Sequence, residues 1–157
     1  HYCSRRQRQM CIRDSPNINL KDSEIKRVVI CSGKVFYSLL EKREKRKINN
    51  IRILRLEQIY PFPSKTLKEM LSKTPSAEVV WCQEEPKNMG AWFFVDRRIE
   101  QVLVDIKSKL TRPTYAGRLE AASPATGSFS RHNKEQNDLV NDALELTTKK
   151  ASRHAAE

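Results

Sequence analysis

Two short, continuously apolar segments limit most strongly what this chain can fold into. They are residues 27–31 (RVVIC) and 78–82 (EVVWC), and each has the length of a strand. A strand with apolar side chains on both faces is typical of a sheet that is covered on both sides. Parallel strands need long crossover connections, and the stretch between the two segments contains helical spacings of apolar residues. We therefore predict a mainly parallel sheet between two layers of helices.

Helical and strand patterns alternate along the rest of the chain. Residues 92–106 give the clearest signal, because apolar side chains recur there at offsets of 3 and 4, as on one face of a helix. Residues 51–56 (IRILRL) mix apolar residues with arginine, which predicts a strand with one more exposed face. The pattern predicts an α/β fold, a three-layer α/β/α domain whose topology is largely fixed by right-handed crossovers. The predicted elements are strand 27–31, helix 35–47, strand 51–56, helix 64–71, strand 78–82, helix 92–106, strand 114–116 and helix 131–146.

The length of 157 residues suffices for one ordinary domain. Residues 1–16 show neither strand nor helix spacing and resemble translated linker sequence, so we interpret them as a foreign or disordered leader. We assign the domain to residues 17–146 and a charged, frayed tail to residues 147–157. Because residue 1 is His and not Met, we expect the chain to be a piece of a longer protein.

The chain is strongly basic, with 30 Lys and Arg residues against 19 Asp and Glu residues and a formal net charge of +11. Such a balance is compatible with nucleic-acid binding. The basic run at residues 42–47 follows Glu41, is interrupted by Glu44 and falls at the end of a predicted helix, so we interpret it as a solvated helix end. No aromatic residue lies among these basic residues to stack on bases. Nucleic-acid binding is therefore the less favoured interpretation. Separately, every apolar run in the sequence is too short to span a membrane.

The motifs do not supply a complete set of catalytic or metal-binding residues. Ser32, Gly33 and Lys34 form a strand-to-helix turn, but the Walker motif requires an upstream glycine and a Ser or Thr where Val35 stands. His132 has no serine in a GxSxG elbow and no second histidine at ligand spacing, so we interpret it as structural or interfacial. The four cysteines also lack metal-ligand spacing and indicate a reducing, intracellular compartment. We assign no catalytic, cofactor-binding or metal-binding residue.

Glu84 and Glu85 follow the third predicted strand, at the end where open α/β sheets often bind ligands. Adjacent carboxylates point in different directions, so the two do not by themselves form a general acid and a general base. The alternatives are capping of backbone amides and pairing with arginines across an interface.

One segment resembles the motif of a known family. Residues 81–92 (WCQEEPKNMGAW), the signature segment, resemble the WCQEEPxNxGAW motif of the thiamine-dependent, decarboxylating component of 2-oxoglutarate dehydrogenase. Further stretches agree with this family in the expected order, and the resemblance covers residues 25–146. They are residues 27–37 (RVVICSGKVFY), 53–63 (ILRLEQIYPFP), 115–127 (YAGRLEAASPATG) and 136–144 (QNDLVNDAL).

The resemblance implies the non-catalytic C-terminal domain of this component, with a transketolase C-terminal-like fold. The full-length enzyme of the family uses thiamine diphosphate and Mg to decarboxylate 2-oxoglutarate in the tricarboxylic acid cycle, and it passes the succinyl group to a lipoyl carrier. The family's GDG thiamine motif and its catalytic histidines are missing from this sequence. We therefore expect the cofactors to be bound by upstream sequence, and this chain alone to bind none and to be inactive.

The resemblance also implies partners: the rest of the same subunit, a homodimer mate and the lipoyl succinyltransferase component. The compartment would be the cytoplasm of a bacterium or the mitochondrial matrix of a eukaryote.

We expect a polar, semi-rigid contact loop followed by an exposed tryptophan. The alternative is that this loop closes only the domain's own core. The interface candidates are Glu84, Glu85, Asn88, Gly90 and Trp92. The alternative function for the whole chain is a freestanding basic α/β binding module.

Overall fold

The computed structural model describes residues 12–15, 21–123 and 127–145, so the predicted tail and most of the predicted leader lie outside the described residues. A five-stranded sheet has the strand order β1-β3-β2-β4-β5. All neighbouring strands are parallel except β1, which is antiparallel to β3. The strands are β1 (Ile12–Asp14), β2 (Arg27–Cys31), β3 (Ile51–Leu56), β4 (Glu78–Pro86) and β5 (Thr114–Arg118). The helices are η1 (Asp22–Glu24), α2 (Val35–Lys45), α3 (Ser64–Leu71), α4 (Trp92–Asp105) and α5 (Phe129–Leu144).

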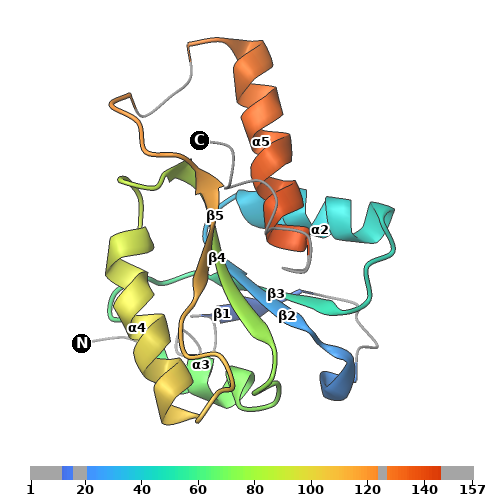
Figure 1. Cartoon of the computed structure of the whole chain (residues 1–157), viewed down its shortest axis with the longest axis vertical. Helices are drawn as coiled ribbons and strands as arrows, with labels where there is room; N and C mark the ends of the chain where they lie inside the picture. The colour runs from blue at the N-terminus through green and yellow to red at the C-terminus, as the bar shows by residue number, and fades with distance from the viewer. Residues whose placement is uncertain (1–11, 16–20, 124–126, 146–157) are drawn as a thin grey trace, which may run out of the picture.

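The sheet lies between two helical layers, α3 and α4 on one face and α2 and α5 on the other (Figure 1). Successive side chains of a strand point to opposite faces. Val28 and Ile30 of β2 accordingly pack in one core with α3 and α4, whereas Val29 and Cys31 pack in the other core with α2 and α5. All four side chains are fully buried, which explains why residues 27–31 are apolar after Arg27. The predicted three-layer fold with a mainly parallel sheet is confirmed.

Strand β1 corrects the predicted boundary of the fold. Ile12 is buried and is the register partner of Leu56 on β3. Asp14, at the other end of β1, forms an ion pair with Arg52 of β3. The prediction that residues 1–16 stand outside the fold is therefore wrong for Ile12–Asp14, because these residues complete one edge of the sheet.

Arginines of this region are packed more closely than the sequence predicts. Arg43, in the basic run of α2, is only 3% exposed, and its Nη1 donates to the Ser15 hydroxyl at 2.8 Å. The interpretation of that run as a solvated helix end is wrong for Arg43. Arg52 and Arg55 are three residues apart on β3 and so belong to opposite faces, and Arg55 Nη1 donates to the Tyr37 hydroxyl at 3.0 Å. The two arginines of β3 therefore lie on opposite faces of the sheet, and each has a partner within the domain. For this reason β3 has no single exposed face.

Candidate interface site

The signature segment begins inside the sheet. The sequence predicts a strand that ends at Cys82 and a polar loop over residues 83–89, whereas β4 continues to Pro86. A register shift between Cys82 and Pro86 marks an irregularity in the pairing of β4 with β5, where Pro86 pairs with Arg118. The predicted loop is wrong for its first four residues, because the partner strand that extends β4 is distant in sequence and leaves no periodic signal.

Gln83 is the polar centre of this segment and is 2% exposed. Its side-chain Oε1 accepts hydrogen bonds from Trp81 Nε1 at 2.9 Å and from the backbone amide of Trp92 at 3.1 Å. Its Nε2 donates to the backbone carbonyls of Met89 at 2.7 Å and Pro86 at 3.1 Å. One carboxamide thus joins the end of β4, the following turn and the start of α4. Gln83 is a functional residue that the sequence does not predict, since a polar residue after a strand gives no sign of burial.

Gly90 and Trp92 complete this connection inside the domain. Gly90 has a φ of +68°, which glycine adopts without steric cost, and a Cβ at this position would lie 3.0 Å from Nε2 of Gln83. Trp92 is 6% exposed, and its ring centroid lies 5.2 Å from that of Tyr115. The expectation of an exposed tryptophan is wrong, because Trp92 lies on the face of α4 that packs against the sheet.

The three remaining candidates have different surroundings. Glu84 is half-buried, and its Oε1 accepts a hydrogen bond from Gln136 Nε2 of α5 at 2.8 Å. Asn88 is exposed and pairs with the backbone of Ala121, donating from Nδ2 at 3.0 Å and accepting at Oδ1 at 3.1 Å. Glu85 is exposed. The side chains of Glu84 and Asn88 therefore fasten the domain's own segments together, while Glu85, Asn88 and Gly90 are the exposed candidates.

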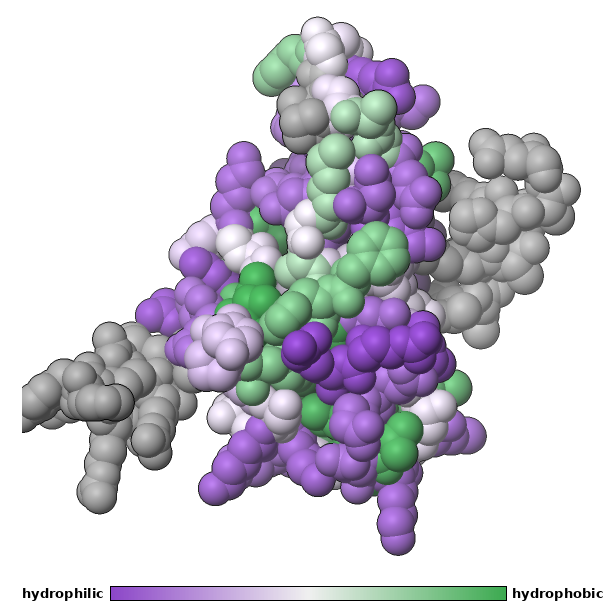
Figure 2. Space-filling model, turned by 90° about the vertical axis from the view of Figure 1, so that its left-hand side faces the viewer, coloured by the Kyte–Doolittle hydropathy of each residue, from purple (hydrophilic) through white to green (hydrophobic). Residues whose placement is uncertain are grey.

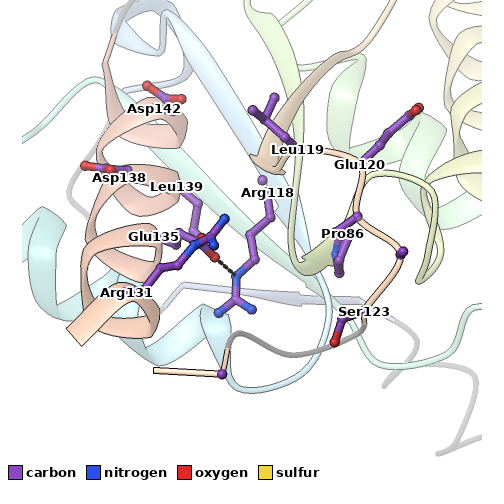
Figure 3. Close-up of a pocket in the computed structure, with 14 residues that line it drawn as sticks. Pro86, Arg118, Leu119, Glu120, Ser123, Arg131, Glu135, Asp138, Leu139 and Asp142 are labelled. Atoms are coloured by element: carbon purple, nitrogen blue, oxygen red, sulfur yellow. Dashed lines mark hydrogen bonds and ion pairs between the residues drawn. The ribbon is translucent and has the colours of Figure 1, made fainter. Parts of the chain in front are cut away.

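A cavity of about 610 Å³ lies between the end of β5, the loop that follows it and one side of α5. Figure 3 shows Arg118 and Arg131 reaching toward Glu135 at this place. Arg118 Nε lies 3.4 Å from a carboxylate oxygen of Glu135, and its Nη2 lies 2.9 Å from Nδ1 of His132. His132 thus contacts β5 through Arg118, in keeping with the predicted structural role. Charges of both signs line the cavity. The role of Arg118 could not be predicted from the sequence, because its partners lie on another element.

The two described cysteines are poor nucleophiles. Cys31 and Cys82 are register partners on β2 and β4, and both are fully buried. Burial raises the pKa of Cys31 to about 12 and also raises the pKa of Cys82, so both remain protonated thiols at neutral pH. Within residues 12–15, 21–123 and 127–145, no three His, Cys, Asp or Glu side chains are grouped so that they could hold a metal ion. No helix in these ranges is long and apolar enough to cross a membrane.

Comparison with known proteins decides the family. The family described as "2-oxoglutarate dehydrogenase C-terminal" matches residues 4–144. The chain belongs to this family. The match includes the whole signature segment and begins within the predicted leader, so it reaches further toward the N-terminus than the resemblance seen in the sequence. The predicted family is confirmed.

Curated relatives of this chain are named "2-oxoglutarate dehydrogenase E1 component". Those of Brucella anthropi and Brucella ovis are each 56% identical to this chain over 124 residues, which are 79% of this chain and 12% of the relative. The chain thus spans about 12% of the length of the curated relatives that it matches. The family match supports a dehydrogenase domain and does not support the freestanding binding module.

A solved structure titled "Split gene transketolase, inactive beta4 tetramer" is similar with a TM-score of 0.49. The two chains are 16% identical, and the alignment covers 84% of this chain and 42% of that chain.

Proposed function

We propose that this chain is the C-terminal domain of a 2-oxoglutarate dehydrogenase E1 subunit, and that it supports the enzyme through contacts and not through catalytic groups. The observation that carries this proposal is the 56% identity to E1 components over 124 residues. The bonding around Gln83 supports the second part, because the signature segment builds a rigid strand-to-helix connection. A buried carboxamide with such partners rigidifies a fold, whereas catalysis needs groups that reach a substrate.

The rest of the full-length subunit is proposed to bind thiamine diphosphate and Mg²⁺, to decarboxylate 2-oxoglutarate and to pass the succinyl group to a lipoyl carrier. Thiamine diphosphate supplies the carbanion chemistry when it is bound. The described residues of this chain include no group of three or more His, Cys, Asp or Glu side chains that could hold the Mg²⁺ ion. This chain alone is therefore proposed to be inactive.

The same proposal gives the partners and the compartment. The partners are the rest of the subunit, a homodimer mate and the lipoyl succinyltransferase component. The compartment is the bacterial cytoplasm, which agrees with the Brucella relatives. Of the interface candidates, Glu85, Asn88 and Gly90 are exposed, and these three remain the proposed contact residues of the signature segment.

A decarboxylation assay tests the proposed function. The 157-residue chain and a full-length subunit that contains it are compared for release of carbon dioxide from 2-oxoglutarate, with thiamine diphosphate and Mg²⁺ added. We expect activity in the full-length subunit and none in the chain alone. Activity of the chain alone, or a folded but inactive full-length subunit, would contradict the proposal.

A further inference from the structure

An aromatic patch lies beside the signature segment, and we define it as Tyr60, Phe93 and Phe94. Tyr60 is 78% exposed and Phe93 is 63% exposed, and the ring centroids of Tyr60 and Phe94 are 6.3 Å apart. Tyr60 follows β3 and Phe93 lies in the first turn of the helix that follows β4, so the patch lies at the carboxyl edge of the parallel sheet. Figure 2 shows the α4 side of the molecule, with a band of hydrophobic surface bordered by hydrophilic side chains.

Contacts within the domain hold Phe94, one member of the patch, in position. Phe94 is half-buried and packs against the core. The guanidinium carbon of Arg98 lies 3.6 Å from the centroid of the Phe94 ring, and Arg98 Nη1 donates to the Phe94 carbonyl at 2.6 Å. Single exposed hydrophobic side chains are common, whereas here the Tyr60 and Phe94 rings contact each other and the exposed Phe93 is next to Phe94 along the chain. Rings that are already ordered lose little conformational entropy when a partner covers them.

We propose that the aromatic patch docks onto the preceding domains of the same subunit. This inference rests on the proposed function, and it adds a surface that the signature segment does not provide. The matched family is a C-terminal one, and the chain covers 12% of the E1 relatives, so most of such a subunit precedes this domain. The carboxyl edge of an open parallel sheet is also where this class of fold leaves a crevice. Aromatic residues and arginine are the residue types enriched in the centre of interfaces.

The size of the patch favours a tethered partner over a second copy of the chain. Aromatic side chains bury about 150–250 Å² each, so these partly exposed rings offer roughly 350 Å². An interface between separate proteins buries about 800 Å² on each partner. Interfaces between domains of one chain begin at about 600 Å² in total, or about 300 Å² on each side. A linker gives an effective concentration in the millimolar range, so a small surface is sufficient for docking within one subunit.

Hydrogen–deuterium exchange of the isolated 157-residue chain and of the full-length subunit tests the docking directly. Peptides that contain Tyr60 or Phe93 should exchange about tenfold more slowly in the full-length subunit. A peptide that contains Leu110, which is 47% exposed beyond the far end of α4, should exchange at the same rate in both. Equal exchange at Tyr60 and Phe93 would overturn the proposal. Protection there that appears in the isolated chain as its concentration rises would overturn it too, because a second copy would then be the occupant.

Matched substitutions separate docking from folding. Phe93→Ser and Val104→Ser each remove an exposed hydrophobic side chain from α4, at 63% and 49% exposure. Both should leave the melting temperature of the isolated chain nearly unchanged. In the full-length subunit, Phe93→Ser should raise the rate of proteolytic release of the domain about tenfold, and Val104→Ser should not. Equal rates would overturn the docking surface. Proteolysis does not depend on catalysis, so a failure of the proposed function would show separately, as an inactive wild-type subunit.

Discussion

Replacing Arg27 with methionine should destabilise the domain through the end of its last helix. Arg27 is 1% exposed and begins β2. Its Nη1 donates to the backbone carbonyls of Asp142 at 3.1 Å and Ala143 at 3.0 Å, in the last turn of α5. Its Nε and Nη2 donate to Glu78 Oε2 at 3.0 and 2.7 Å. The last carbonyls of a helix lack donors within the helix, so Arg27 supplies them and also complements the helix dipole.

The size of the effect follows from what methionine leaves behind. Methionine occupies much of the same space but donates no hydrogen bond, so the Glu78 carboxylate and the helix carbonyls lose their donor. Removal of one partner from a buried ion pair costs about 3–5 kcal/mol. The Glu78 side chain is 15% exposed, so water replaces part of the lost interaction and the lower end of that range applies. We expect the free energy of unfolding to fall by about 3 kcal/mol and the melting temperature by roughly 6–12 °C.

Urea denaturation followed by the fluorescence of Trp81 and Trp92, which both lie in the core, measures this change. Arg97→Met is the control, because the Arg97 side chain is 74% exposed, and the midpoint should not move. In a double-mutant cycle with Glu78→Leu, the double variant should lose less than the sum of the single variants, since no carboxylate is left without its arginine. A loss below about 1 kcal/mol for Arg27→Met, or additive losses in the cycle, would refute the reasoning.

Two further predictions concern buried groups. Gln83→Leu should lower the free energy of unfolding by about 2–4 kcal/mol, because Trp81 Nε1, the Trp92 amide and the Met89 carbonyl each lose a partner. Urea denaturation measures this change. A loss below about 1 kcal/mol would show that the carboxamide is dispensable. Burial raises the pKa of Cys31 from 9.0 to about 12, so above pH 9 the unfolded chain releases a proton that the folded chain retains. The free energy of unfolding should therefore be insensitive to this thiol below pH 9 and should fall as pH rises toward 12. The fall should be shallower in Cys31→Ala. Identical pH profiles of the two proteins would count against this prediction.

The layers of the fold could be predicted because the apolar patterns record burial on both faces of a strand. Strands β2 and β4 have apolar side chains at successive positions, and the structure places β2 at the centre of the sheet with β4 beside it. Strand β1 could not be predicted in the same way. It has three residues and one buried side chain, Ile12, and its position depends on pairing with a strand far along the sequence. Such pairing leaves no periodic signal in so short a segment.

The signature segment shows where sequence reasoning misplaced side chains. Trp92 precedes Val95 and Ile99 at helical spacing, and that spacing already indicated a position on the apolar face of α4. Its proximity to polar residues led to the opposite expectation. The polar partners of Gln83 depend on the backbone turn at Gly90, which brings carbonyl groups around one carboxamide. A buried amide with all its partners and a solvated amide have the same appearance in a sequence.

Strand β1 also covers a side of β3 that would otherwise be open to further strands. Without Ile12–Asp14, the outer side of β3 would present a row of backbone donors and acceptors with apolar side chains above and below it. An open, flat edge of this kind is a template on which further strands add, and natural sheets block such edges with short or charged strands. A charged three-residue strand that runs against the direction of its neighbour is such a block. Versions of the chain trimmed at residue 17 would lose it, so we expect them to self-associate more readily than the 157-residue chain.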